Sequence, residues 1–254
     1  MVTPSVADAS IPILQDLVDR HRRLYEGPGI DAKLDELSRE GSPGQLSARD
    51  IHRLVRTSRA VYFDTHVEVV SGHHTATYVR FESIARFPQL LTLIAHDMAE
   101  WLARTFQTDP LAGIVATSSD ARLLAENVRE LLGDRMPLRI VLTPFSRETG
   151  KIGTDVPQGT IRTGDRFVSL NDVTTRGVCV RKLGTVITDH RGELAGMMVF
   201  ARRDSGQFPL MDELTAKYPF YFSADFHMPQ WDPSECPPCQ KKMPLLQWKD
   251  LPEL

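Results

Sequence analysis

The chain has 254 residues, 41% hydrophobic and 25% charged, which is typical of a globular protein with one or two domains. Thirty Lys and Arg residues against 33 Asp and Glu residues give a net charge of −3, so a protein that coats nucleic acid is not expected. No apolar run approaches the roughly 18 residues of a membrane span, and three cysteines do not make a disulfide framework. Residues 1–12 lack Lys and Arg and contain Asp8, which argues against a secretory signal and predicts a cytoplasmic protein.

Residues 1–60 are predicted to form a helical N-terminal extension. Apolar residues between Ile11 and Val18 recur at three- and four-residue spacing, as in an amphipathic helix. Ser47 is placed to cap a second short helix. Residues 61–254 are expected to form the main domain, including a C-terminal cap that contains cysteines.

Short apolar strands alternate with helices after residue 61. Helices are expected at 87–104 and 120–132, and strands at 67–70, 112–116, 138–142, 167–170 and 194–201. This alternation predicts an α/β fold with a mainly parallel sheet flanked by helices. Ligand sites are then expected in the loops that follow the carboxyl ends of the strands.

The loop after Leu170 has the residue types of an anion site. It reads NDVTTRGVC over residues 171–179, with an acidic residue at the strand tip, then hydroxyls and a glycine. Backbone N–H groups in such a turn can bind a phosphate, and the carboxylate can accept hydrogen bonds from a sugar diol. A capped strand-to-helix turn without a ligand explains the same pattern, so both interpretations remain open.

Residues 167–177 (FVSLNDVTTRG) resemble the phosphoribosyl-pyrophosphate (PRPP) motif of type I phosphoribosyltransferases, and of orotate phosphoribosyltransferases in particular. The resemblance implies the fold of that family. It also implies transfer of phosphoribose from PRPP to orotate or a related aromatic or nucleobase acceptor, with release of pyrophosphate, as in pyrimidine metabolism. Mg²⁺ bound with PRPP and a homodimer are implied as well. The implied PRPP-binding residues are Asn171, Asp172, Val173, Thr174, Thr175, Arg176, Gly177, Val178 and Cys179.

Further segments match the family in order, from about residue 62 to residue 246. Residues 71–78 (SGHHTATY) resemble the family's base-binding segment, which implies acceptor contacts from Ser71, His73, His74 and Tyr78. Residues 147–151 (RETGK) resemble its mobile catalytic loop, which implies catalytic roles for Arg147, Lys151 and Asp172. Residues 192–206, ending in RRDSG, resemble the next strand and its loop.

The ligand loops depart from the family pattern. The family's pyrophosphate loop is glycine-rich because the backbone must approach the pyrophosphate closely, whereas residues 116–123 read ATSSDARL. Asp120 adds a negative charge there, and the remaining implied pyrophosphate contacts are Thr117, Ser118, Ser119 and Arg122. Asn171 stands in place of the first acidic residue, Arg176 in place of a Thr, and residues 157–159 (PQG) in place of Arg-Arg-Gly.

These departures leave three functions open. An active phosphoribosyltransferase, a glycosyltransferase by class, is the favoured interpretation. The alternative from another class is a catalytically degenerate paralogue that binds a nucleotide or phosphosugar as a regulator, or that serves as a protein-interaction subunit. The third is an enzyme with altered chemistry on a ribose 5-phosphate compound.

Cys236 and Cys239 (CPPC) resemble a cysteine-containing tail found in one subgroup of the family, and they have the spacing of half a zinc site. His227 is the histidine nearby in sequence, and only folding could bring Cys179 or His190 to the pair. A redox pair and simple packing are the alternatives, so the sequence leaves the metal unknown.

Overall fold

The computed structural model describes residues 6–39, 42–203 and 208–254, with side chains from Pro12 onward. A six-stranded sheet forms its centre, in the order β1-β10-β9-β8-β6-β7. Five strands are parallel: β6 (Gly113–Thr117), β7 (Arg139–Thr143), β8 (Arg166–Thr174), β9 (Glu193–Arg203) and β10 (Phe220–Phe226). The short β1 (Ser38–Arg39) pairs antiparallel with β10 at the edge.

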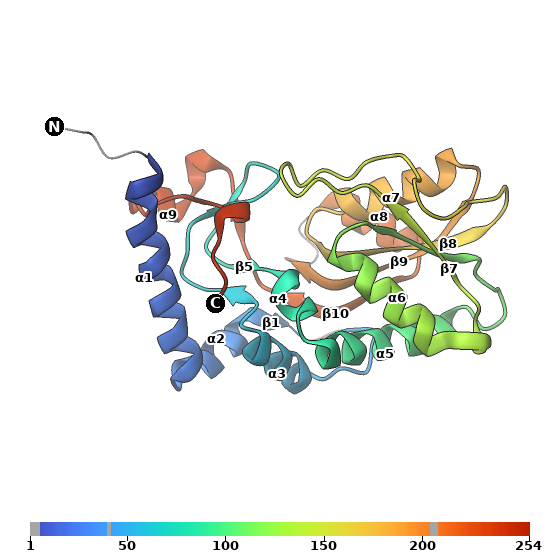
Figure 1. Cartoon of the computed structure of the whole chain (residues 1–254), viewed down its shortest axis with the longest axis horizontal. Coiled ribbons are helices and arrows are strands. Elements are labelled where there is room, and N and C mark those ends of the chain that lie inside the picture. The colour runs from blue at the N-terminus through green and yellow to red at the C-terminus, as the bar shows by residue number, and fades with distance from the viewer. Residues whose placement is uncertain (1–5, 40–41, 204–207) are drawn as a thin grey trace.

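Helices cover both faces of this sheet (Figure 1). On one face lie α5 (Pro88–Thr105) and α6 (Asp120–Leu132), and on the other lie α7 (Val178–Asp189) and α8 (Pro209–Lys217). Strand residues alternate between the two cores: Ile114 packs with α5 and α6, whereas Val115 packs with α7. Because both faces are buried, the strands are apolar along most of their length, as expected for a parallel sheet.

The strand order reverses between β6 and β8. From β6 the chain adds β7 on one side and then returns to add β8 on the other side. Ligands of open parallel sheets bind at the carboxyl ends of the strands at such a reversal. There the Thr117 hydroxyl of β6 donates to Oδ1 of Asn171 of β8 at 3.5 Å, so the loops after these two strands start side by side.

The predicted α/β fold with its mainly parallel sheet is confirmed. The strands expected at 112–116, 138–142, 167–170 and 194–201 are β6 to β9, and the helices expected at 87–104 and 120–132 are α5 and α6. The strand expected at 67–70 is wrong as a member of this sheet, since only β3 (Val67–Glu68) forms, in a separate sheet. Strand β10 was not predicted, because Ser223 and Asp225 interrupt its apolar pattern.

Three helices precede residue 60: α1 (Val6–Glu26), α2 (Gly29–Leu37) and α3 (Ala48–Ser58). The predicted cap of α3 is confirmed, since the Ser47 side chain accepts from the Asp50 N–H in a capping box. Side chains of α2 and α3 belong to the core that also contains α5 and α6. The boundary at residue 60 stays a prediction, although β1 joins the segment before it to the central sheet.

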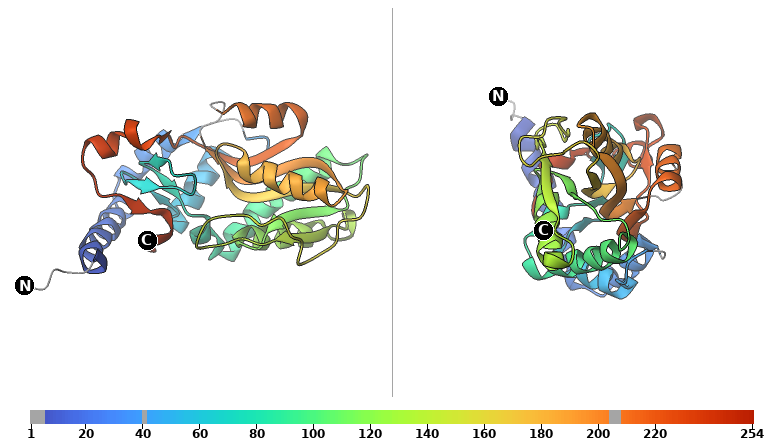
Figure 2. Two further views of the ribbon diagram at one scale, coloured as in Figure 1. Left: turned by 90° about the horizontal axis from the view of Figure 1, so that it is seen from above. Right: turned by 90° about the vertical axis from the view of Figure 1, so that its right-hand side faces the viewer.

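The two small sheets and the C-terminal elements lie beside α1, at the end of the molecule where the C-terminus also lies (Figure 2). A small sheet has the order β11-β4-β3-β12, and β2 pairs with β5. The bounds are β2 (Val61–Tyr62), β4 (His74–Thr75), β5 (Tyr78–Val79), α4 (Phe81–Ala85), β11 (Gln230–Trp231), α9 (Pro237–Gln240) and β12 (Leu246–Gln247). Single 3₁₀ turns are η1 (Gly133–Arg135), η2 (Pro233–Glu235) and η3 (Trp248–Asp250). Within the described ranges, no helix combines the length and apolarity needed to cross a membrane.

Candidate functional site

The turn after β8 has the geometry of an anion site. Strand β8 ends at Thr174, Gly177 takes a left-handed conformation with φ of 81°, and α7 begins at Val178. The backbone angle favours glycine at this position, and a side chain at Gly177 would also have to displace Sδ of Met211, which lies 2.7 Å from the added carbon. The first N–H groups of α7 have no partner within the helix and carry its positive dipole end, which suits a phosphate.

Asp172 and Asn171 lie at the same strand end with different partners. Burial, helped by the negative charge of Asp120, raises the pKa of Asp172 to about 6. One carboxylate oxygen of Asp172 accepts from the Val173 N–H at 2.8 Å. Asn171 is buried, accepts from Thr117, and donates from Nδ2 to the Val173 carbonyl at 3.1 Å. The less buried Asp172 is therefore the side chain with a carboxylate to offer a ligand.

Arg203, which the sequence analysis did not single out, lies under this turn. Its Nε donates to the Thr175 hydroxyl at 2.8 Å, and its positive charge lowers the pKa of Asp172. The Arg176 guanidinium lies 4.9 Å from the ring centroid of Phe208. Arg203 is the second arginine of the RRDSG segment at residues 202–206, and this segment is the sequence signal that could have identified it. Residues 204–207 lie outside the described residues.

Cys179 lies in the first turn of α7, where burial raises the pKa of its thiol to about 11 and the charge of Asp172 adds to the effect. The hydroxyl of Thr174 is buried and has no hydrogen-bond partner among the described residues. The structure thus brings the implied PRPP-binding residues 171–179 into one turn at the strand reversal.

The loop after β6 satisfies its own polar groups. Ser119 caps α6 by accepting from the Ala121 N–H at 3.3 Å, and its hydroxyl lies 2.7 Å from that of Thr117. Ser118 Oγ accepts from the Phe145 N–H at 3.1 Å. Arg122 pairs with Glu126 on the next turn of α6 at 3.0 Å. The hydroxyls that a pyrophosphate would use are therefore already engaged within the chain.

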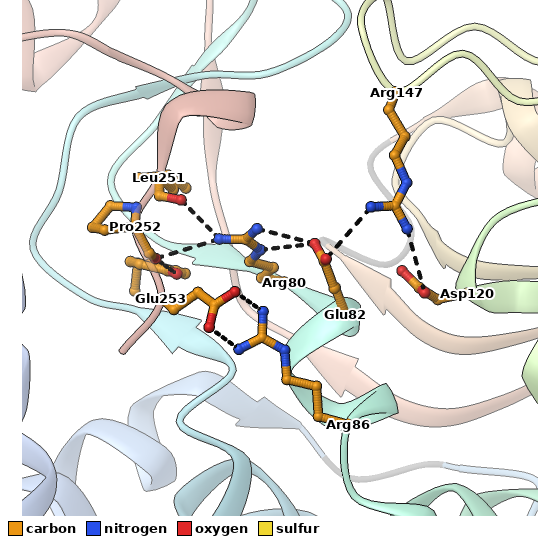
Figure 3. A network of polar contacts seen from close by, with 9 residues as sticks. Arg80, Glu82, Arg86, Asp120, Arg147, Leu251, Pro252 and Glu253 are labelled. Atoms are coloured by element: carbon orange, nitrogen blue, oxygen red, sulfur yellow. Dashed lines mark hydrogen bonds and ion pairs between the residues drawn. The ribbon is translucent and has the colours of Figure 1, made fainter.

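Asp120 opens α6 and belongs to a charged network at this edge (Figure 3). Arg147 reaches across from the loop after β7 and lies 3.8 Å from an Asp120 oxygen and 3.5 Å from a Glu82 oxygen. Glu82 also accepts from Arg80, which donates to the Leu251 carbonyl. Burial raises the pKa of Asp120, whereas Arg147 lowers it. The negative charge of Asp120 thus occupies the helix end where an anion would bind.

The loop after β7 contacts neighbouring segments at two places. Leu142 bridges to Gln158, so residues 157–159 run along the edge of β7. At the tip, Gly150 has a positive φ of 65°, and a side chain there would collide with Val70 in the hairpin between β3 and β4. The Arg147 side chain is 69% exposed, and Lys151 is exposed as well. Both implied catalytic cations are therefore on a loop that packs on the 66–75 hairpin.

The implied acceptor residues divide into separate environments. Burial raises the pKa of Tyr78 to about 12, and the charges of Asp172 and Arg203 act on it, so Tyr78 lies near the turn after β8. His73 contacts Ser71 and lies 3.2 Å from an Asp232 oxygen. His74 is buried and faces the opposite way, toward Cys239 at 3.3 Å. The structure therefore brings Ser71 and His73 together, but it places Tyr78 and His74 in two other environments.

Cys236 and Cys239 lie beside two histidines that the sequence analysis did not connect with them. His66, His74, Cys236 and Cys239 each offer one ligand atom, and these atoms all lie within 4.8 Å of one another. The residues that the sequence offered as further ligands lie elsewhere. His227 contacts Arg39, His190 contacts the Val186 carbonyl, and Cys179 lies in the first turn of α7. The sequence signal for these two histidines is weak, because they share one face only through the hairpin that β3 and β4 form in the structure.

Sequence comparison identifies relatives of this chain, although no family model matches it. It is 25% identical over 197 residues to orotate phosphoribosyltransferase of Thermus thermophilus, covering 77% of this chain and 98% of the relative. Among solved structures, Mycobacterium tuberculosis orotate phosphoribosyltransferase in complex with inorganic phosphate aligns with a TM-score of 0.50 at 17% identity, over 68% of this chain and 86% of that one. Leishmania donovani UMP synthase aligns with a TM-score of 0.51 at 17% identity, over 68% of this chain and 35% of that one.

The sequence relatives and the structural neighbours agree with each other and with the strand order and the turn after β8. This chain therefore has the fold of the type I phosphoribosyltransferases, and orotate phosphoribosyltransferases are among the proteins that it resembles in sequence.

Proposed function

We propose that this protein is a PRPP-dependent phosphoribosyltransferase that acts on orotate or a related aromatic acceptor. The observation that carries the proposal is the turn from Asp172 to Val178, which offers a carboxylate, hydroxyls and a helix N-terminus at the reversal point of the sheet. Relatives named orotate phosphoribosyltransferase support the substrate class.

The proposed roles follow from the partners of each residue. Asp172 accepts hydrogen bonds from the ribose hydroxyls, and the N–H groups at the start of α7 bind the 5′-phosphate. Arg203 supports the turn through Thr175. As pyrophosphate leaves, Arg147 and Lys151 of the loop after β7 offset its growing negative charge. The charge of Asp172 acts on the pKa of Tyr78, so Tyr78 lies near Asp172, on the side where the acceptor binds.

Mg²⁺ fits the proposed site in its donor chemistry. Mg²⁺ is usually held by one or two carboxylates together with substrate phosphates, and Asp172 offers one carboxylate at the end of β8. Asn171 supplies no charge and its amide is already engaged. When bound, the ion would neutralise part of the pyrophosphate charge, with Asp172 as its main protein ligand.

A specific observation favours a second candidate, a binding protein without transfer activity. Asp120 supplies the negative charge at the start of α6, and the hydroxyls of Thr117, Ser118 and Ser119 are engaged within the chain. Such a loop weakens binding of a pyrophosphate but leaves the turn after β8 intact. This candidate would bind a ribose 5-phosphate group, as in a nucleoside monophosphate, at least as well as PRPP.

Calorimetric titration with PRPP and Mg²⁺ tests the proposal, followed by measurement of pyrophosphate release with orotate and other aromatic acceptors. Two charge-assisted hydrogen bonds are worth about 3–5 kcal/mol together, so Asp172→Ala should weaken PRPP binding by at least ~100-fold. Asp189→Ala, which removes an exposed carboxylate at the other end of α7, is the matched control and should bind as the original chain does.

The outcomes separate the two candidates. PRPP binding that depends on Asp172 together with acceptor-dependent pyrophosphate release supports the enzyme. Binding of ribose 5-phosphate with no pyrophosphate release from any acceptor supports the binding protein. Failure of PRPP and ribose 5-phosphate alike to bind the folded chain would refute both.

A further inference from the structure

The four side chains His66, His74, Cys236 and Cys239 lie outside the site described above and come from two distant parts of the chain. His66 precedes β3 and His74 lies in β4, whereas Cys236 and Cys239 flank the first residues of α9. Strands β3 and β4 form an antiparallel hairpin in which Val67 pairs with Thr75. Since His66 and His74 fall on the same face of this hairpin, their rings both point at the tail.

The distances within this cluster match a tetrahedral metal site. Nε2 of His66 lies 3.0 Å from Nδ1 of His74 and 3.4 Å from each sulfur, and Nδ1 of His74 lies 3.3 Å from Sγ of Cys239. With Zn–N bonds of about 2.05 Å and Zn–S bonds of about 2.3 Å, tetrahedral ligands lie about 3.3 Å apart for two nitrogens and about 3.6 Å apart for nitrogen and sulfur. The four atoms therefore surround a space of the size that one zinc ion needs.

Hydrogen bonding alone accounts poorly for this arrangement. Nδ1 of His66 lies 2.9 Å from the Met243 carbonyl, and because a carbonyl only accepts, this nitrogen carries the proton. Nε2 of the neutral ring then has one lone pair, yet it faces three neighbours at hydrogen-bond distance. A metal ion uses that lone pair together with the other three. The contact to Met243 is the kind of outer interaction that orients a metal-binding histidine.

We propose that His66, His74, Cys236 and Cys239 bind one Zn²⁺ ion as a structural His₂Cys₂ site. Soft sulfur and imidazole ligands in tetrahedral geometry select zinc over the magnesium or calcium that oxygen ligands prefer. His66, His74 and Cys236 are almost fully buried, so the site is closed, as structural zinc sites are. The three cysteines are free thiols, so both members of the pair can serve as thiolate ligands.

The position of the site explains what the ion would do. It would join the C-terminal tail to the hairpin between β3 and β4, each of which is short and has little secondary structure of its own. Val70 of that hairpin packs on Gly150 in the loop that carries Arg147. Zinc would thus stabilise the hairpin against which the loop after β7 packs, without taking part in any reaction.

Metal analysis of the full chain, purified without a histidine tag, tests the proposal. We expect about one equivalent of zinc per chain and less than ~0.1 equivalent in Cys236→Ser and His66→Asn, since each removes a ligand of a four-coordinate site. Cys179→Ser and His190→Asn are matched controls that change a cysteine and a histidine outside the cluster, and they should keep the zinc.

A second measurement applies if the ligand variants do not fold. Co²⁺ added to chelator-treated wild-type protein should give the visible bands of tetrahedral cobalt and a thiolate charge-transfer band, and zinc should displace it. Three results would overturn the proposal: folded protein that holds no metal and takes up neither ion, undiminished zinc in Cys236→Ser, or a disulfide between Cys236 and Cys239 in protein purified without oxidant.

Discussion

The loops after β6 and β8 begin side by side at the carboxyl ends of two central strands, yet the helix that follows each loop begins with groups of different charge. The loop after β8 leads through Gly177 into α7, so it carries a positive helix end, and the Arg203 guanidinium beneath it donates to Thr175. The loop after β6 leads into α6 through Ser119 and Asp120, so a cap and a carboxylate already occupy the equivalent helix end.

This difference shows that one helix N-terminus is available to an anion and the other is not. Both are strand-to-helix connections of the same sheet, so the fold alone does not decide which one binds phosphate. The decision lies with single residues: glycine with a positive φ in one loop, and an acidic residue with serine in the other. Substitutions at these positions can therefore break or sharpen the contrast.

The largest effect is expected for Gly177→Ala in the loop after β8. A left-handed backbone costs alanine about 1–2 kcal/mol, and Met211 must also move, so the free energy of unfolding should fall by about 2–3 kcal/mol. Ribose 5-phosphate binding should weaken in parallel. Urea unfolding and calorimetry measure the two effects.

Gly164→Ala is the control for that change. Gly164 has nearly the same φ, 80°, but no described atom lies within 4 Å of the added carbon, so only the backbone cost of about 1 kcal/mol remains. Equal losses in the two variants would show that packing against Met211 does not matter to the turn.

Asp172→Asn should stabilise the protein in a pH-dependent way. The pKa of Asp172 is raised to about 6 in the folded protein, against about 3.9 in an unfolded chain. The folded state therefore binds the proton more tightly, and the stability that the protonated form provides is lost as pH rises from about 4 through about 6. Because Asp172 is half-buried, the gain in the variant at pH 7.5 should be about 1–2 kcal/mol, with almost none at pH 4.

Thermal unfolding of both proteins across this range measures the difference. A gain that is the same at pH 4 and pH 7.5 would mean that ionisation of the Asp172 carboxyl does not destabilise the folded protein, which contradicts its raised pKa.

Asp120→Asn should raise the affinity for PRPP by about five- to tenfold, because one unit charge near the pyrophosphate is worth about 1 kcal/mol at a hydrated surface. Affinity for ribose 5-phosphate, which lacks the pyrophosphate, should stay the same. Asp134→Asn, in the turn after the same helix, is the control. An unchanged PRPP affinity in Asp120→Asn would contradict the view that this loop repels the pyrophosphate.

The smallest effect on stability is expected for Arg147→Gln. The side chain is 69% exposed, and exposed ion pairs contribute about 0–1 kcal/mol. The free energy of unfolding should therefore change by no more than ~0.5 kcal/mol. Pyrophosphate release, in contrast, should slow markedly if Arg147 acts on the leaving group. A variant that loses neither stability nor activity would remove Arg147 from the proposed chemistry.

Most of the central sheet could be predicted from the sequence because its strands are buried on both faces. Residues 112–116 and 138–142 are uninterrupted or nearly uninterrupted apolar runs, and each lies within one residue of an observed strand. Strand β10 escaped prediction because its polar residues depend on tertiary partners: the Tyr221 hydroxyl donates to Asp97, and Arg202 donates to Asp225. Such partners are distant in sequence and leave no local pattern.

The turn after β8 could be singled out as a candidate site from the sequence because all its residues are consecutive. The network from Glu82 through Arg147 to Asp120 was not, since it joins α4, the loop after β7 and α6. The same limit applies to the cysteines. Their spacing indicated half a metal site, but the two histidines beside them lie more than 160 residues earlier in the chain and become neighbours only through the hairpin.

The pairing of β1 with β10 has a consequence for how copies of this protein behave toward one another. An open strand edge is a template on which another chain can add a strand, which leads to aggregation. Ser38 and Arg39 cover part of the β10 edge, and Gln158 does the same for β7 at the other end of the sheet. These short pairings cover part of both edge strands of the sheet. Removal of the N-terminal segment should therefore expose the β10 edge and lead this protein to polymerise through β10.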